Sequence, residues 1–320
     1  MVTPAHNEAE NLSALFERLR RALDPLGLEW EWLIVDDHSS DTTFSVATEL
    51  ARRDPRVRCL RFSRNFGSHV AIACGLEHAS GRCVAVMAAD LQDPPETLPV
   101  LLEQWRQGAQ VVWAARHRRQ GEEAGTATLS RLYYLLMRRV VGIPEMPATG
   151  ADFFLIDRTI VNALQGFNEH NSSLFALITW MGFRQATISY SKEPRQHGRS
   201  SWTLKKKLKL FTDSITSFTY LPIRLMSYAG IVTALVGFAY AAFVFAHALA
   251  GHRVQGWSSL MVVVLVASGF QMLMMGVLGE YLWRALDESR RRPRYLIEAE
   301  VGGMTTPVAT SPRRDAAKLE

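Results

Sequence analysis

The chain has 320 residues, 48% of them hydrophobic, and a formal net charge of +5. This composition excludes a disordered or low-complexity protein and leaves room for one large domain with an appendage. Cys59, Cys74 and Cys83 lie in or beside apolar segments without CxxC spacing. Buried reduced thiols, as in a cytosolic domain, are therefore favoured over a disulfide framework or a zinc site.

The first two hundred residues alternate helix-like and strand-like patterns. Leucines at helical spacing predict a helix that opens at 7–11, and the apolar run 33–35 predicts a strand that ends in Asp36 and Asp37. Side chains at 41–43 can cap the next helix. Strands that alternate with helices predict an α/β fold with a mostly parallel sheet, in which ligands bind at the carboxyl ends of strands.

A short polar turn follows the apolar run 82–86 and contains Asp90, Gln92 and Asp93. Carboxylate and amide oxygens at the rim of a sheet suit a hard divalent cation, which can neutralise a departing diphosphate. Taken alone, such a turn is more often simply solvated, because Asp and Pro are common turn residues. A further helix is expected to begin at Pro94.

Two long apolar segments lie near the C-terminus, from Leu225 to about Leu249 and from Trp257 to about Leu278. Each is long enough to cross about 30 Å of hydrocarbon as a helix. Basic residues precede the first segment and follow the second, which predicts that both termini lie in the cytoplasm. The expected units are a domain over 1–200, basic amphipathic juxtamembrane helices over 201–224, a transmembrane hairpin over 225–282, and a basic segment with a disordered tail over 283–320.

Five motifs follow one another in a fixed order along the chain. They are Pro-Ala-His-Asn-Glu at 4–8, Val-Asp-Asp-His-Ser-Ser-Asp at 35–41, Ser-Arg-Asn-Phe-Gly at 63–67, Ala-Asp-Leu-Gln-Asp-Pro-Pro-Glu at 89–96 and Asp-Phe-Phe-Leu-Ile-Asp-Arg at 152–158. Their order and spacing resemble family 2 glycosyltransferases. With the paired apolar segments, the chain is similar to the polyprenyl-phosphate group of that family, which includes bactoprenol glucosyltransferases and dolichol-phosphate mannosyltransferases.

The resemblance covers about residues 1–295 and implies a GT-A nucleotide-sugar-binding domain. It implies inverting transfer of a hexose, with Mg²⁺ or Mn²⁺, from a nucleotide sugar to a polyprenyl phosphate such as undecaprenyl or dolichol phosphate. UDP-glucose is the first expectation for the donor and GDP-mannose the second. The enzyme would lie in the cell (inner) membrane with its catalytic domain in the cytoplasm.

The resemblance also implies roles for individual residues. The nucleotide-sugar pocket would be lined by Pro4, His6, Glu8, Asp37, Ala89 and Asp90. The metal would be held by Asp90 and Gln92, and the catalytic candidates are Asp90 and Asp152. Asp152 would orient the acceptor phosphate or take its proton, although a plain polar residue at a strand end is an equal alternative. Phosphates would contact Arg116, Arg131, Arg195 and Arg199. Asp157 is expected to pair with Arg158 or to cap the helix that follows.

The chain departs from the family pattern in three places. Ala88 stands where the first acid of an Asp-x-Asp motif is usual, and Ser201 stands where Lys is frequent. The chain also begins at Met1-Val2-Thr3-Pro4, so we expect nearly all of the first strand to be missing and the start site to be assigned too late.

Three alternatives stay open at this point. One is a family 2 enzyme that acts on a glycan acceptor, and another is a homologue whose catalysis is impaired by Ala88. The lysine-rich run at 205–209 would also suit nucleic acid, but its place beside apolar segments favours lipid headgroups, so no nucleic-acid partner is expected. Gly-bearing faces of the two apolar segments leave room for a homo-oligomer.

Overall fold

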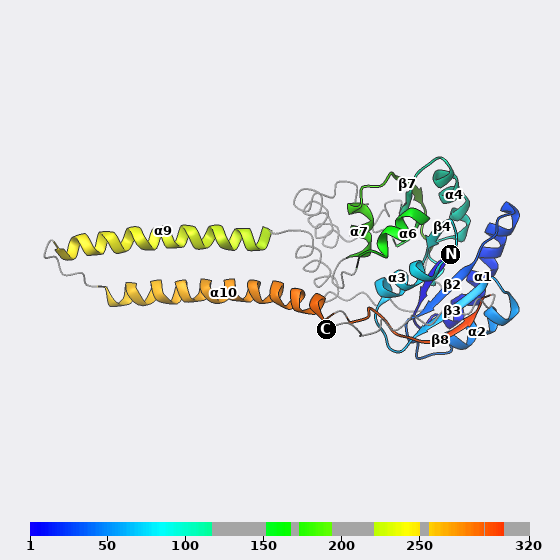
Figure 1. The fold of residues 1–320 in the computed structure, drawn as a ribbon, viewed down its shortest axis with the longest axis horizontal. Coiled ribbons are helices and arrows are strands. Elements are labelled where there is room, and N and C mark those ends of the chain that lie inside the picture. Colours follow the sequence, from blue (N-terminus) through cyan, green and yellow to red (C-terminus); the bar gives the residue numbers. More distant parts are fainter. Residues whose placement is uncertain (117–151, 168–172, 194–220, 250–255, 291, 304–320) are drawn as a thin grey trace, which may run out of the picture.

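The computed structural model describes residues 1–116, 152–167, 173–193, 221–249, 256–290 and 292–303. These residues form a mixed sheet flanked by helices, joined to a pair of long helices (Figure 1). Several predicted features lie outside the described residues: Arg131, Arg195, Arg199, most of the expected juxtamembrane helices and the tail from 304 onward.

The sheet has eight strands in the order β7-β5-β6-β4-β1-β2-β3-β8. Strands β1 to β4 are parallel neighbours in the order β4-β1-β2-β3, and β5 pairs in parallel with β7. Strand β6 is antiparallel to β4 and β5, and β8 is antiparallel to β3. The bounds are β1 Val2–Ala5, β2 Trp32–Asp36, β3 Val57–Phe62, β4 Cys83–Val86, β5 Val111–Arg116, β6 Phe154–Asp157, β7 Gln185–Tyr190 and β8 Ile297–Gly302.

Helices cover both faces of the sheet, so its central strands are apolar on both sides. In β2, Trp32 and Ile34 pack into one core cluster with α1 and α2, while Leu33 and Val35 pack into a second cluster with α3. The helices of this domain are α1 Ala9–Leu23, α2 Thr43–Arg53, α3 Ser68–His78, α4 Leu98–Arg106, α6 Arg158–Leu164 and α7 Leu174–Trp180, with short 3₁₀ segments η1 Asp24–Leu26 and η2 Pro95–Thr97. The predicted α/β class is confirmed.

An earlier start site stays a prediction, and the residues at the start of the chain form a four-residue first strand, β1. Its four residues pair with Leu33–Asp36 along their whole length, and Val2 also pairs with Val86 of β4. Helix α3 lies so close that a Cβ at Gly75 would come within 2.2 Å of Val2 Cγ1. Glycine at 75 thus permits the close packing that seats β1 in the centre of the sheet.

Helices α9, Leu221–Leu249, and α10, Trp257–Ser289, contact each other and extend away from the sheet (Figure 1). The most apolar 18-residue windows of Ile223–His247 and Leu260–Ser289 have mean hydropathies of 2.1 and 2.2, and 0% of each window is buried. Both helices are therefore long and apolar enough to cross a membrane. Apolar surface of this extent requires an apolar environment that the described residues do not supply.

The sequence did not predict strand β8, because the expectation for 283–320 was a basic segment followed by a disordered tail. After α10 the chain returns to the sheet, and β8 pairs with β3 from Arg58↔Gly302 to Phe62↔Ile297. Its run Ile297–Gly302 alternates apolar and acidic residues, which is a strand pattern, but it is short and was not singled out in the sequence. In the structure it pairs the open side of β3, which would otherwise expose unpaired backbone groups.

Candidate active site

The sheet topology brings the predicted residues to one end, which we call the site rim. The rim consists of the loops that follow β1 to β4: residues 6–8, 37–41, 63–67 and 87–93. Strand β5 runs parallel to β4, because each is antiparallel to β6, so Arg116 ends at this rim and Asp152 lies just before β6 starts there. The prediction that Asp36, Asp37 and Asp90 follow strand ends is confirmed.

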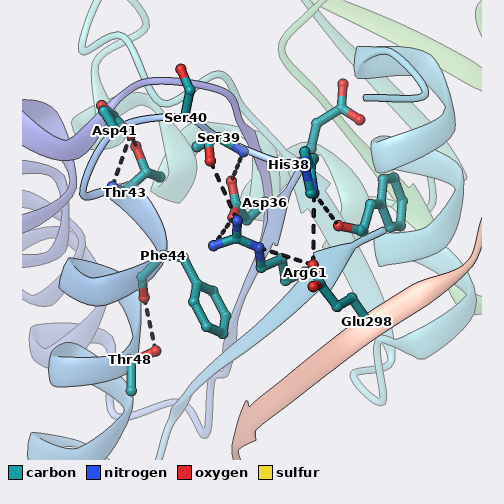
Figure 2. A network of polar contacts seen from close by, with 12 residues as sticks. Asp36, His38, Ser39, Ser40, Asp41, Thr43, Phe44, Thr48, Arg61 and Glu298 are labelled. Carbon is teal, nitrogen blue, oxygen red and sulfur yellow. Dashed lines mark hydrogen bonds and ion pairs between the residues drawn. The ribbon is translucent and has the colours of Figure 1, made fainter. Parts of the chain in front are cut away.

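Two loops of the rim are joined by hydrogen bonds. Asp36 Oδ1 accepts from Ser39 N at 3.0 Å, and Ser39 Oγ accepts from Asn7 N at 3.0 Å. Asn7 Oδ1 in turn accepts from Ser40 N at 2.9 Å. Asn7 and His38 both have left-handed backbone angles, with φ of 58° and 55°. The loops after β1 and β2 therefore form one connected wall (Figure 2 shows the part that follows β2).

Asp37 has a structural task that the sequence did not predict. Its two carboxylate oxygens accept from Phe66 N at 2.6 Å and from Gly67 N at 2.8 Å. Burial raises the pKa of Asp37, although these two amides favour the ionised form. His6 Nδ1 lies 3.0 Å from Asp37 O and 3.3 Å from Asn65 Nδ2. Asp37 thus anchors the loop after β3, beside the His6 that the sequence placed in the same pocket.

The predicted metal residues lie in one turn. Asp90 is 6% exposed, and its Oδ1 accepts from Gln92 N at 3.2 Å. The described residues hold no group of three or more His, Cys, Asp or Glu side chains that could bind a metal. Mg²⁺ keeps several waters and is often held by one or two carboxylates together with substrate phosphates. The carboxylate of Asp90 and the side-chain amide of Gln92 are oxygen donors of the kind that such a cation binds. Ala88, which is half-buried, supplies no ligand.

Arg116 and Asp152, predicted for separate tasks, form an ion pair at the rim. Arg116 Nη2 lies 3.5 Å from Asp152 Oδ2, and the two side chains are 35% and 52% exposed. A pair this open is weak. Both side chains therefore remain accessible at the rim.

A buried acid behind the metal turn was missed as a distinct feature. Asp93 is 1% exposed, accepts a short hydrogen bond from the Tyr190 hydroxyl and lies 3.7 Å from Lys192 Nζ. Burial raises the pKa of Asp93, and the charge of Lys192 opposes that shift. Tyr190 is the last residue of β7, the edge strand of the sheet. The hydrogen bond therefore links the turn after β4 to that edge. No local sequence signal links two residues so distant in the chain.

The remaining predicted residues can now be placed. Pro4 lies in β1, and Glu8 N donates to Thr43 Oγ1 at 2.9 Å. Ala89 is 2% exposed and belongs to the core, so its side chain packs inside the domain. Asp157 caps α6, because its carboxylate accepts a hydrogen bond from Thr159 N at 2.8 Å. Of the two predicted roles for Asp157, the helix cap is therefore confirmed.

Comparison with known proteins agrees with this geometry. Residues 1–164 match the profile described as Glycosyl transferase family 2. The uncharacterized glycosyltransferase YkcC of Bacillus subtilis (strain 168) is 36% identical, with 94% of each chain covered. The bactoprenol glucosyl transferase of Shigella phage SfV is 34% identical, covering 94% of this chain and 98% of that one.

Among solved structures, the mannosyltransferase PcManGT from Pyrobaculum calidifontis in complex with GDP-Man and Mn²⁺ is 16% identical, covers 88% of this chain and 86% of its own, and has a TM-score of 0.45. A likeness of that size adds nothing to the argument. The family match over the catalytic half and the relatives that match nearly the whole chain identify it: the protein belongs to glycosyltransferase family 2.

Proposed function

We propose that the protein is an inverting, metal-dependent transferase that moves a hexose from a nucleotide sugar to a polyprenyl phosphate. One observation carries the proposal: a family 2 domain and two apolar helices without buried faces occur in the same chain. An enzyme that acts on a soluble glycan does not need such helices. The relative from phage SfV, named a bactoprenol glucosyl transferase, supports a prenyl-lipid acceptor and glucose as the sugar.

The membrane arrangement is part of the proposal. The helices α9 and α10 would span the cell membrane as a hairpin, and Arg224, Arg284, Arg290, Arg292 and Arg294 lie near the two ends that face the catalytic domain. Basic residues are retained on the cytoplasmic side of a membrane. This distribution supports a catalytic domain and both termini in the cytoplasm, where nucleotide sugars are available.

The donor would bind at the wall formed by the loops after β1 and β2. That wall is preorganised, since Asp36, Ser39 and Asn7 hold it through backbone and side-chain hydrogen bonds. Asp90 and Gln92 would hold Mg²⁺ or Mn²⁺, which when bound supplies Lewis-acid stabilisation of the departing diphosphate. UDP-glucose is our first choice of donor and GDP-mannose our second.

The acceptor would bind at the other part of the rim. Arg116 would take the acceptor phosphate, because a guanidinium matches two phosphate oxygens. Asp152, released from the 3.5 Å pair, would orient that phosphate and accept its remaining proton if it arrives monoprotonated. The phosphate oxygen then forms the new bond to the sugar while the bond to the nucleoside diphosphate breaks, which inverts the configuration at that carbon.

The test is transfer of labelled sugar to undecaprenyl phosphate by the full chain in detergent, with UDP-glucose and GDP-mannose in parallel. A lipid-linked product that is lost with EDTA is expected. Asp90→Ala should abolish metal-stimulated transfer with an unchanged melting temperature. Absence of product from both donors would contradict the lipid transferase, and full turnover by Asp90→Ala would remove the metal from the proposal.

Ala88 favours a second candidate, a catalytically impaired homologue. The metal turn carries one carboxylate fewer than is usual for the family, because Ala88 stands in the place of an acid. In that case the wild-type chain would bind nucleotide without turnover, and Ala88→Asp would restore transfer.

A further inference from the structure

The segment that follows the apolar hairpin is built into the catalytic sheet. Tyr295 stacks on Phe62 with ring centroids 5.2 Å apart, and its hydroxyl donates to Glu77 Oε2 at 2.5 Å. Strand β8 begins two residues later and pairs with β3. Because β8 is antiparallel to β3, the start of β8 lies at the site rim and its end lies at the opposite end of the sheet.

Glu298, near the start of β8, reaches His38, in the wall formed by the loops after β1 and β2, and Arg61 of β3 (Figure 2). Its Oε2 lies 3.3 Å from Arg61 Nε and 3.6 Å from His38 Nδ1. His38 belongs to the turn after β2. Arg61 is on β3, where the pairing with β8 shifts register between Arg61 and Phe62. That irregularity brings the acidic side chain beside the end of β3.

Arg61 matters because it faces a buried acid. Asp36 is 0% exposed, and its Oδ2 accepts no hydrogen bond within the described residues. Arg61 Nη1 lies 3.8 Å from that oxygen, and the guanidinium sits over the Phe44 ring at 4.9 Å. A buried carboxylate needs a nearby opposite charge. Arg61 therefore stabilises Asp36, whose other carboxylate oxygen accepts the hydrogen bond from Ser39 N in the turn after β2.

We propose that Glu298 is a positioning residue of the donor pocket, so that the strand after the hairpin is part of the nucleotide site. Glu298 contacts Nε of the Arg61 guanidinium, whose Nη1 faces Asp36, and through these contacts it limits the motion of Arg61 and His38. It would act through these two residues and not on the substrate itself. The inference rests on the proposed function, since it takes the turn after β2 as a wall for the nucleoside diphosphate.

Strand β8 itself supplies a matched control. Glu300 has the same charge and lies two residues further along β8, but beyond the register shift its partners are on the α3 side of the sheet, whereas Arg61 packs on Phe44 of α2. It pairs with Arg58 at 3.0 Å, and Arg58 donates to His78 O at 3.1 Å, away from the turn after β2. A general effect of losing an acid from β8 would appear in both variants, whereas a positioning effect would appear only at Glu298.

The experiment compares Glu298→Gln, Glu300→Gln and Glu298→Asp in the full chain in detergent. Donor KM, kcat, the Kd for UDP and for GDP, and the melting temperature would be measured for each. Glu298→Gln should raise the donor KM and the diphosphate Kd about two- to fivefold, the range expected for one partly exposed ion pair. Its kcat and acceptor KM should stay at the wild-type value. Glu298→Asp should recover part of the loss, and Glu300→Gln should match wild type.

Equal donor KM values for Glu298→Gln and Glu300→Gln would overturn the positioning role. So would a parallel loss of kcat and melting temperature in Glu298→Gln, which would mean that Glu298 only stabilises the fold. These results differ from failure of the proposed function, in which the wild-type chain itself transfers no sugar and binds neither diphosphate.

Discussion

The close approach of α3 to β1 makes Gly75 a sensitive position. A methyl group there would lie 2.2 Å from Val2 Cγ1 and 3.2 Å from Val2 Cγ2, and Val2 is 0% exposed. Val2 is β-branched and stiff, so it cannot rotate away easily. Overpacking of this severity costs about 3 kcal/mol, and the better helix propensity of alanine returns about 1 kcal/mol. Gly75→Ala should therefore lower the free energy of unfolding by about 2 kcal/mol.

A double-mutant cycle with Val2→Ala tests this reasoning. Val2→Ala alone loses two buried carbons, about 2 kcal/mol with its cavity. In the double variant the new methyl at 75 occupies part of that cavity, so the total loss should be only about 1 kcal/mol. Melting would be followed by tryptophan fluorescence in detergent, where 1 kcal/mol corresponds to roughly 2–4 °C. Additive losses in the double variant would refute the close contact between α3 and β1.

Three further predictions concern single sites. Ala88→Asp should lower the Mn²⁺ concentration for half-maximal transfer by about tenfold, since it adds a carboxylate ligand; an unchanged metal requirement would separate position 88 from the cation. Burial raises the pKa of the Cys74 thiol to about 12, so a thiol reagent at pH 8 should label Cys74 only after denaturation, and rapid labelling of the folded protein would contradict its burial. Burial opposes ionisation of Asp157, but hydrogen bonds from Thr159 and Trp105 outweigh it and lower the pKa. The stabilisation by Asp157 is thus present above the unfolded pKa of about 3.9 and is lost as the pH falls through the folded value. The gap in melting temperature between wild type and Asp157→Ala, worth about 1 kcal/mol near pH 7, should close in acid.

The parallel centre of the sheet and the position of the acids could be predicted from local patterns. The run at 33–35 is apolar on both faces because helices cover both sides, and a strand that ends in Asp36 and Asp37 places them at the rim wherever its neighbours lie. Asp90 follows β4 for the same reason. These features depend on residues near one another in the chain, which is why sequence reasoning reached them.

Features that depend on distant pairing could not be predicted. Strand β6 is antiparallel within a mostly parallel sheet, and only that reversal brings Asp152 next to Arg116. The hydrogen bond between Asp93 and Tyr190 likewise joins the turn after β4 to the end of β7, which lies far away in the chain. Ala89 stays a prediction, and in the structure it is buried in the core. Arg131, Arg195 and Arg199 stay predictions.

The return of β8 to the sheet sets an order of events during synthesis. Strand β3 is complete at Phe62, but the strand that covers its open side is translated only at Ile297–Gly302, after both apolar helices. At roughly 5–20 residues per second, the nascent domain would wait on the order of tens of seconds with an uncovered strand while the hairpin leaves the ribosome. If the hairpin spans a membrane as proposed, its insertion could precede completion of the catalytic sheet, and the enzyme would then acquire its finished sheet beside the bilayer that holds the proposed acceptor.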